Sequence, residues 1–247
     1  MAKKYSTHYI TINDKKLEVR VYQEWRSSLR YSIGKNYIIL RMPHGAGLGP
    51  LMEVELAKLK KWATKSLRES PGLLDQLVPR IYRHGEELKV MGDVYILTIE
   101  ESIRKTVTAK IIQNRIIIKC PSNAEIKAKQ DAIRGVIIKL INKAYLPVIT
   151  HRVNQINDRF FHEPLKRVSL KYNTSNWGSC SSQRNINLSS RLLLTNRDVI
   201  DYVIVHELSH LKVMDHSPAF WEIVEQVMPD YQKCEDWLDE FGSECNF

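Results

Sequence analysis

The sequence lacks any segment that could cross a membrane or direct secretion. None of its apolar stretches approaches the roughly 18 consecutive residues that a membrane-spanning helix needs. The most apolar region, residues 136–150, is interrupted by Lys139, Asn142 and Lys143. The N-terminus carries lysines but no apolar segment behind them, so no signal peptide is expected. We therefore expect a cytoplasmic protein with no membrane partner.

Cysteine is scarce, and its spacing argues against two kinds of site. The four cysteines are Cys120, Cys180, Cys234 and Cys245. No two of them form a C-x-x-C pair, which argues against a thiolate zinc site and against a thioredoxin-like redox motif. We expect free thiols, and we interpret Cys180 as a small buried hydrophobic residue rather than a nucleophile. The sequence also has no P-loop and no clustered aspartates that would bind magnesium.

Charge is abundant but unevenly distributed. The net charge is +9. Residues 1–123 hold 22 Lys and Arg against 12 Asp and Glu, whereas residues 198–247 hold 2 against 12. A basic N-terminal half could attract nucleic acid or another polyanion. The basic residues are scattered along the sequence without aromatic interleaving, so an ordinary solubilising surface is the simpler interpretation.

The N-terminal half contains an internal repeat. Apolar and polar side chains alternate between turn signals, which predicts strands and hairpins. After a shift of 78 residues, Tyr37–Pro43 falls on Arg115–Pro121. A helical pattern follows each copy, over about residues 51–70 and 124–160, with a kink or break predicted at Pro147. We interpret the pattern as a duplicated strand–hairpin–helix unit; convergence on a common hairpin pattern is the alternative.

A run near the C-terminus carries the chemistry. Its apolar residues recur at helical spacing, and Thr195 with Asp198 predicts a capping box at the start of the helix. His206 and His210 stand four residues apart, so both imidazoles lie on one face and can share a zinc ion. Glu207 lies beside them, where a carboxylate can take a proton from a metal-activated water.

A zinc ion that keeps one position open for water needs a third protein ligand. His216 is the best candidate because only five residues separate it from His210. Ser217 and Pro218 follow it and predict the start of another helix, which places His216 on a short connection. Glu222 and Glu225 on that next helix are the alternative ligands, because zinc also accepts a carboxylate.

Two blocks of sequence carry a family resemblance. They are His206-Glu-Leu-Ser-His210-Leu with Asp215-His216-Ser-Pro-Ala-Phe220-Trp221, and the upstream Trp177-Gly178-Ser179-Cys180-Ser181. Together they resemble the YgjP-like metallopeptidase family, relatives of the SprT-like and WLM zinc proteases. The resemblance implies a zinc-dependent peptidase in which His206, His210 and His216 bind the metal and Glu207 is the catalytic base. The family's basic triplet before the tryptophan is replaced here by Thr174-Ser175-Asn176.

We expect an α+β protein. A duplicated β-rich N-terminal part, residues 1–122, would precede a minimal zincin-like catalytic region with an HExxH helix, residues 123–247; a single domain is the alternative. The predicted activity is zinc-dependent hydrolysis of a polypeptide substrate, which could pair with an exposed strand edge near residues 177–189. Two other functions stay open: a metal-dependent nucleotide pyrophosphohydrolase, and a nucleic-acid-associated protein with a structural zinc.

Overall fold

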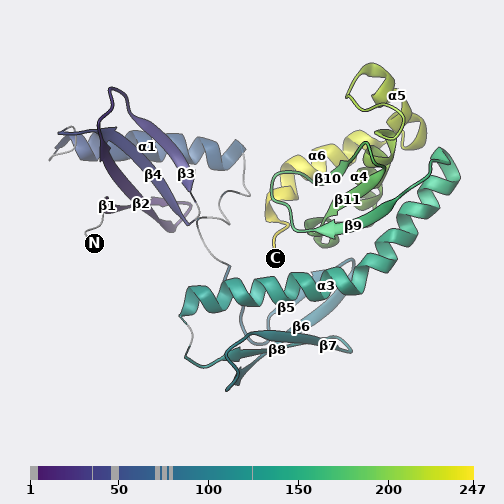
Figure 1. Cartoon of the computed structure of the whole chain (residues 1–247), viewed down its shortest axis with the longest axis horizontal. Helices are drawn as coiled ribbons and strands as arrows, with labels where there is room; N and C mark the ends of the chain where they lie inside the picture. The colour runs from purple at the N-terminus through teal and green to yellow at the C-terminus, as the bar shows by residue number, and fades with distance from the viewer. Residues whose placement is uncertain are drawn as a thin grey trace. The chain divides into compact units, whose positions relative to one another are not determined.

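The chain is an α+β protein that divides into two compact units. The computed structural model describes residues 5–34, 36–45, 50–69, 73, 77, 80–123 and 125–247. Figure 1 shows the N-terminal unit (Met1–Arg80) and the C-terminal unit (Ile81–Phe247). The sequence suggested a boundary at residue 122 instead. The structure divides the chain earlier because Ile116, in the second copy of the repeat, shares one hydrophobic core with Leu208 beside the predicted metal ligands.

The N-terminal unit is a four-stranded sheet with one helix packed on it. Its elements are β1 (Ser6–Ile12), β2 (Lys15–Glu24), β3 (Arg30–Gly34), β4 (Tyr37–Pro43) and α1 (Pro50–Glu69). The strand order is β1-β2-β4-β3, in which two antiparallel hairpins meet through a parallel β2–β4 pairing. Successive side chains of a strand point to opposite faces. One face therefore buries Val19 and Ile38 in a core with Leu59 of α1.

The C-terminal unit begins with a second copy of this sheet. Its strands are β5 (Glu87–Val90), β6 (Asp93–Ser102), β7 (Thr108–Ile112) and β8 (Arg115–Pro121), in the order β5-β6-β8-β7. The two copies have the same register. Val19 pairs with Ile38 in the first copy, and Leu97 pairs with Ile116 in the second, 78 residues later. Both copies thus have the same strand order and register, as the predicted repeat requires.

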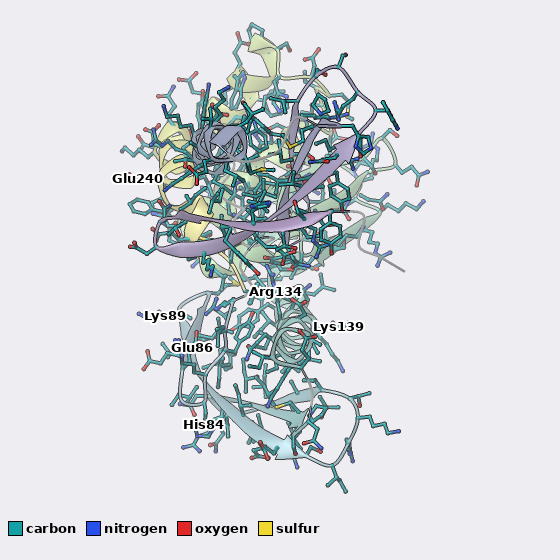
Figure 2. All side chains as sticks on the ribbon, turned by 90° about the vertical axis from the view of Figure 1, so that its left-hand side faces the viewer. His84, Glu86, Lys89, Arg134, Lys139 and Glu240 are labelled. Carbon is teal, nitrogen blue, oxygen red and sulfur yellow. The ribbon has the colours of Figure 1, made fainter. Side chains whose placement is uncertain are left out.

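The helix that follows the second sheet is longer than its counterpart. α3 (Ile126–Ile156) is a single helix of 31 residues that contains Pro147, so the predicted kink or break is not a break. Figure 1 shows the helix changing direction along its length. A proline lacks a backbone N–H and crowds the preceding turn, which bends a helix whose two halves are both held by packing. The helix packs on the second sheet, and in Figure 2 the labels Lys139 and Lys89 show where α3 and strand β5 of that sheet lie.

The remainder of the C-terminal unit carries the predicted metal ligands. Its elements are a π-helical turn (Asn157–Phe161), β9 (Arg167–Lys171), β10 (Gly178–Cys180), β11 (Asn185–Ser189), α4 (Arg197–Ser209), α5 (Pro218–Val227) and α6 (Tyr231–Phe241). Strand β11 pairs antiparallel with β10 and parallel with β9. Among the helices that the structure describes, none is both long and apolar enough to cross a bilayer.

The helix that carries the first two histidines begins one residue later than predicted. Asn196 caps α4, and its side-chain oxygen accepts a hydrogen bond from the Val199 N–H at 3.0 Å. The predicted capping box of Thr195 and Asp198 is therefore wrong. The Thr195 hydroxyl donates to the Leu192 carbonyl at 2.8 Å instead. Asn196, an equally good capping residue, therefore caps the helix.

Candidate metal centre

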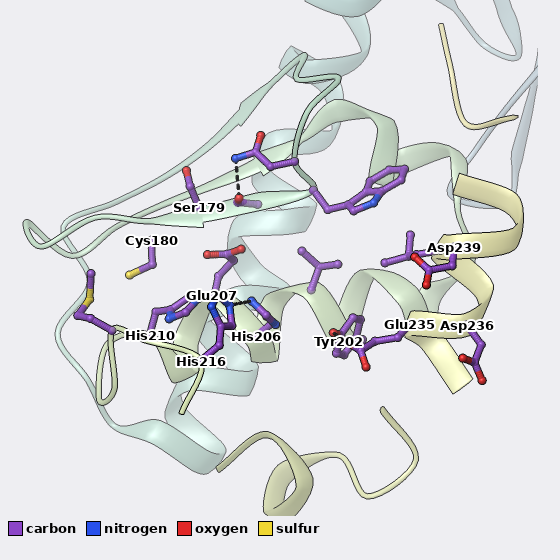
Figure 3. Close-up of a pocket in the computed structure, with 16 residues that line it drawn as sticks. Ser179, Cys180, Tyr202, His206, Glu207, His210, His216, Glu235, Asp236 and Asp239 are labelled. Carbon is purple, nitrogen blue, oxygen red and sulfur yellow. Dashed lines mark hydrogen bonds between the residues drawn. The ribbon is translucent and has the colours of Figure 1, made fainter. Parts of the chain in front are cut away.

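Three histidines converge at the C-terminal end of α4. His206 lies in the last turn of that helix, His210 caps its C-terminus, and His216 comes from the connection to α5. One ring nitrogen of each lies within 4.8 Å of the others, and Figure 3 shows the three rings turned toward one another. The Nε2 atoms of His206 and His216 are 3.1 Å apart. Two nitrogens about 2.05 Å from one tetrahedral zinc ion would be separated by roughly 3.3 Å, so the residues fit such an ion.

The protonation of the rings suits metal binding. The Nδ1 atom of His210 lies 3.2 Å from the Val213 carbonyl oxygen. A carbonyl oxygen only accepts, so Nδ1 carries the proton and Nε2 keeps its lone pair. Burial lowers the pKa of His206 to about 4, with further contributions from the neighbouring His210 and His216. Burial also lowers the pKa of His210, so both imidazoles favour the neutral form that metal ligation requires.

Aromatic side chains enclose the histidines on one side. The buried ring of Phe220 stacks on His210 with 4.5 Å between centroids, and it lies 4.9 Å from His206 and from His216. Trp221 contacts His206 at 5.8 Å. Since Phe220 is in the first turn of α5, the packing of that helix holds the third histidine against the first two.

Glu207 is a buried carboxylate at the same site. Its side chain is 4% exposed, and its Oε2 atom has no hydrogen-bond partner among the described residues. Burial raises its pKa to about 8. Gly178 of β10 makes the room for it, because a Cβ atom at that position would lie 2.5 Å from Oε1 and 2.7 Å from Cγ of Glu207. A lone buried carboxyl beside a histidine cluster is the arrangement expected of a proton-transfer group.

Strand β10 presents an open edge beside Glu207. It is the outermost strand of its sheet in the described part of the chain. The Trp177 carbonyl accepts from the Ser189 N–H at 2.7 Å. In an antiparallel pair every second residue bonds to the partner strand, so the N–H and C=O groups of Gly178 and Cys180 point away from β11. On that side the Asn176 amide donates to the Gly178 carbonyl at 2.9 Å. The remaining groups can receive an extended chain as an additional strand.

A pocket of about 700 Å³ joins these features. Its lining runs from the histidines and β10 to the carboxylates Glu235, Asp236 and Asp239 of α6, all labelled in Figure 3. Among the residues that the structure describes, the lining contains no lysine or arginine. The Tyr202 hydroxyl donates to Glu235 at 2.7 Å. The pocket therefore has a metal-binding end and an acidic end.

Cys180 agrees in part with the sequence-based interpretation as a small buried hydrophobic residue. It is half-buried and packs against the core, and it also lines the pocket. Burial and the nearby Glu207 charge raise the pKa of its thiol to about 11. The thiol is therefore protonated at neutral pH, which is unsuited to a nucleophile.

Comparison with known proteins decides the family. The family model "YgjP-like, metallopeptidase domain" matches residues 27–241. The chain belongs to the YgjP-like metallopeptidase family. Two crystal structures of metallopeptidase zymogens are similar over part of the chain. Abylysin of Pyrococcus abyssi is 24% identical, with a TM-score of 0.34 over 36% of this chain and 90% of that chain. Jannalysin of Methanocaldococcus jannaschii is 19% identical, with a TM-score of 0.34 over 37% and 94%. A search of curated proteins gave no significant match.

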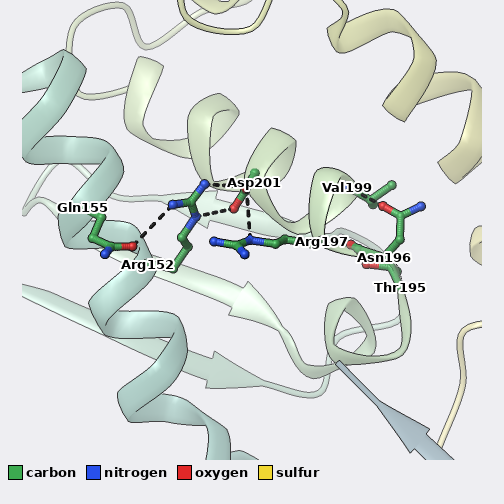
Figure 4. Close-up of polar contacts among 7 residues, drawn as sticks. All are labelled: Arg152, Gln155, Thr195, Asn196, Arg197, Val199 and Asp201. Carbon is green, nitrogen blue, oxygen red and sulfur yellow. Dashed lines mark hydrogen bonds and ion pairs between the residues drawn. The ribbon is translucent and has the colours of Figure 1, made fainter. Parts of the chain in front are cut away.

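An ion pair joins α3 to α4, the helix that ends at the candidate metal centre. Arg152 of α3 donates through Nε and Nη2 to the two carboxylate oxygens of Asp201, at 2.7 and 2.6 Å. Figure 4 shows this fork together with the Asn196 cap at the start of α4. The Asp201 side chain is 14% exposed. Because a bidentate pair fixes both direction and distance, it orients the helix that carries His206 and His210.

Arg191 is a second supporting residue, and the sequence did not show its role. It is buried. Its guanidinium donates to the carbonyls of Cys245 at 2.8 Å, Gly242 at 2.5 Å and Thr174 at 3.2 Å. It also lies 4.1 Å from the centre of the Trp177 ring. Arg191 thus holds the C-terminal segment and the start of β10 together. Its partners lie 17 to 54 positions away in the sequence, so no local pattern indicated this role.

The alternative third ligands lie away from the site. Glu222 and Glu225 of α5 are exposed and line no part of the pocket. The cluster of possible metal ligands found among the described residues contains His216 and neither glutamate. Of the candidates that the sequence left open, His216 alone is placed beside the other two histidines.

Proposed function

We propose that this protein is a zinc-dependent metallopeptidase in which His206, His210 and His216 bind the metal and Glu207 is the general base. The observation that carries the proposal is the convergence of three histidine nitrogens within 4.8 Å, beside a buried carboxylate oxygen without a partner. A structural zinc site has four protein ligands and is closed, whereas a catalytic site keeps a position open. Three histidines at the wall of a pocket favour the catalytic kind.

The metal would supply a Lewis acid that polarises the scissile carbonyl and lowers the pKa of a water molecule. The chain's own residues perform the proton transfers. Glu207 would accept the proton of the attacking water on its free carboxylate oxygen and deliver it to the leaving amine. The burial that raises its pKa in the metal-free protein makes it a better proton carrier near neutral pH than an exposed glutamate.

The pocket favours a polypeptide over a nucleotide. The open edge of β10 lies beside Glu207, so an extended peptide that pairs with it would bring its backbone past the histidines. The three carboxylates of α6 and the absence of lysine and arginine from the lining disfavour a triphosphate, because phosphate groups are recognised by cations and helix N-termini. The acidic end instead suits a cationic side chain of the substrate.

The test compares metal content and hydrolysis for the wild type, Glu207→Gln and His216→Ala. Elemental mass spectrometry should find about one zinc per chain in the wild type and in Glu207→Gln, and little in His216→Ala. Hydrolysis of an unfolded protein should fall by about 10²–10⁴-fold in Glu207→Gln, since general-base catalysis contributes that much. Nucleoside triphosphates assayed in parallel should not be hydrolysed.

Glu222→Gln is the matched control, because it removes an exposed carboxylate from α5 and should keep both metal and activity. Zinc retained in His216→Ala would contradict the three-histidine site. Nucleotide hydrolysis that depends on Glu207 and exceeds protein hydrolysis would replace the peptidase by a pyrophosphohydrolase.

A further inference from the structure

The open face of the N-terminal sheet carries a group of tyrosines and arginines. One face of β1–β4 is buried against α1, and the other is open. Residue alternation brings Tyr22 and Arg20 of β2, Tyr37 and Arg41 of β4, and Tyr5, which precedes β1, to the open side. These five residues, here called the tyrosine–arginine face, are all half-buried. The sequence separates them by up to 36 positions, so their interleaving is visible only in the folded sheet.

The side chains of this face contact one another closely. The Arg20 guanidinium lies 3.6 Å from the centre of the Tyr37 ring and 4.7 Å from that of Tyr5. Arg41 lies 5.1 Å from the Tyr22 ring, and the Tyr5 and Tyr22 rings are 5.3 Å apart. Planar guanidinium and phenol groups therefore alternate across neighbouring strands. Such planes are surfaces on which bases stack.

Two carboxylates hold the arginines in place. Arg20 Nε donates to Glu18 at 2.7 Å, and Arg41 pairs with Glu24. Arg30 of the neighbouring strand β3 is exposed and has no such partner in the part of the chain that the structure describes. The whole N-terminal unit holds 15 Lys and Arg against 7 Asp and Glu, a net charge of +8, whereas the C-terminal unit holds 22 against 21. A polyanion is therefore attracted to the unit that carries the face.

The second copy of the sheet shows that the fold does not require this face. With the same register, Tyr22 is replaced by Glu100, Arg20 by Thr98 and Tyr37 by Arg115. The second copy thus has none of the aromatic residues of the first at these positions. Because both sheets have the same topology, this topology does not require the tyrosines and arginines.

We propose that the tyrosine–arginine face binds single-stranded nucleic acid. Every base has a π-face that stacks on tyrosine or arginine, and phosphates pair with arginine. A duplex hides the faces of its bases, so the geometry favours a single strand. This binding does not depend on peptide hydrolysis, so it can be measured without any hydrolysis of a substrate.

The test is fluorescence anisotropy of labelled oligothymidylate and oligouridylate of about 15 nucleotides, a length near the upper end of the site sizes of single-strand-binding OB-folds. The full-length wild type should bind at least one of them, and the tighter of the two indicates whether DNA or RNA is the ligand. Tyr37→Leu should weaken binding about tenfold because a stacking surface is lost, whereas Tyr37→Phe, which keeps the ring, should bind as the wild type does. A duplex of equal length should bind more weakly.

The duplicated fold offers a matched control for charge. Arg41→Gln and Lys119→Gln each remove one positive charge at equivalent positions of β4 and β8, and each residue has a glutamate partner. Arg41→Gln should weaken binding about fivefold and reduce its salt dependence, whereas Lys119→Gln should change the affinity less than about twofold. Thermal melting confirms that the variants fold.

Several results would overturn the proposal. They are equal losses in Arg41→Gln and Lys119→Gln, equal affinity for duplex and single strand, and no binding at low salt. Polyglutamate that competes as well as the oligonucleotides would assign the face to an acidic protein partner instead.

Discussion

The two copies of the four-stranded repeat share a topology and a register, yet they are used differently. In the first copy the helix α1 has 20 residues, and its core is confined to the N-terminal unit. In the second copy the helix α3 has 31 residues and continues past its sheet to α4. The backbone N–H of Met91, after β5, donates to the Leu193 carbonyl just before α4 at 2.7 Å.

The difference shows how one fold can serve two purposes. The buried face of the second copy supports the candidate metal centre, because the sheet, α3 and α4 contribute to one core. The open face of the first copy is free to carry recognition residues. In this protein the second copy of the sheet therefore contributes to the core beneath the candidate metal centre, whereas the first copy offers an open surface. Four predictions test this difference, beginning with the largest expected effect.

The first expectation is that metal removal affects only one unit. A ligand at about 1,000 times its Kd stabilises the folded state by about 4 kcal/mol. For a unit of this size that corresponds to about 10 °C in Tm. Calorimetry with and without a chelator should show one transition that moves by this amount and one that stays. Two transitions that move together would mean that the units unfold as one.

A matched pair of core substitutions assigns the two transitions. Ile38 and Ile116 occupy equivalent positions, and both are fully buried. Each substitution to alanine should cost about 3 kcal/mol, from the lost methyl groups and the cavity that remains. Ile116→Ala should lower the metal-dependent transition and weaken zinc retention, and Ile38→Ala should lower only the other transition. Loss of zinc in Ile38→Ala would show that the first copy also supports the metal centre.

The third expectation concerns the pH dependence of the metal-free protein. Burial raises the pKa of Glu207 from 4.5 to about 8. The folded state then binds a proton that the unfolded state has lost, so stability decreases as pH rises between these values. Burial lowers the pKa of His206 from 6.5 to about 4, which has the opposite sign but acts only below pH 6.5.

Between pH 6.5 and 8 the effect of Glu207 remains, and the free energy of unfolding of the C-terminal unit should fall by about 1.5 kcal/mol. Urea denaturation of the metal-free protein at the two pH values measures the loss. Glu207→Gln should abolish it, while the N-terminal unit should show no such change. A loss that persists in Glu207→Gln would assign the pH dependence to another group.

The fourth prediction, with the smallest expected effect, compares two exposed loop residues at equivalent positions of the two copies. Trp25 and Ile103 occupy equivalent positions and are almost fully exposed. Alanine at either position should change the free energy of unfolding by less than about 0.5 kcal/mol, as for most surface substitutions. Trp25→Ala should still weaken the binding of single strands several-fold, since the ring is a further stacking surface. Anisotropy of the two variants measures this, and an equal loss in Ile103→Ala would count against a role for the ring.

Local sequence determined much of the fold and the identities of the candidate ligands. The spacing of His206 and His210 on a helix is a property of 3.6 residues per turn, and the structure places His216 beside both, as the sequence predicted. The repeat could be read at a fixed shift because strand alternation and turn residues are local signals. The capping residue of α4 was misplaced by one position because Thr195 and Asn196 are both good caps.

Other features arose only from tertiary contacts, because they join residues that are distant in sequence. The unit boundary depends on which sheet shares a core with α4, and the place for Glu207 depends on the missing side chain of Gly178, 29 positions earlier. The fork between Arg152 and Asp201 joins two helices. The tyrosine–arginine face, which looked like scattered charge in the sequence, was assembled by strand pairing, since pairing brings every second residue of separate strands onto one surface.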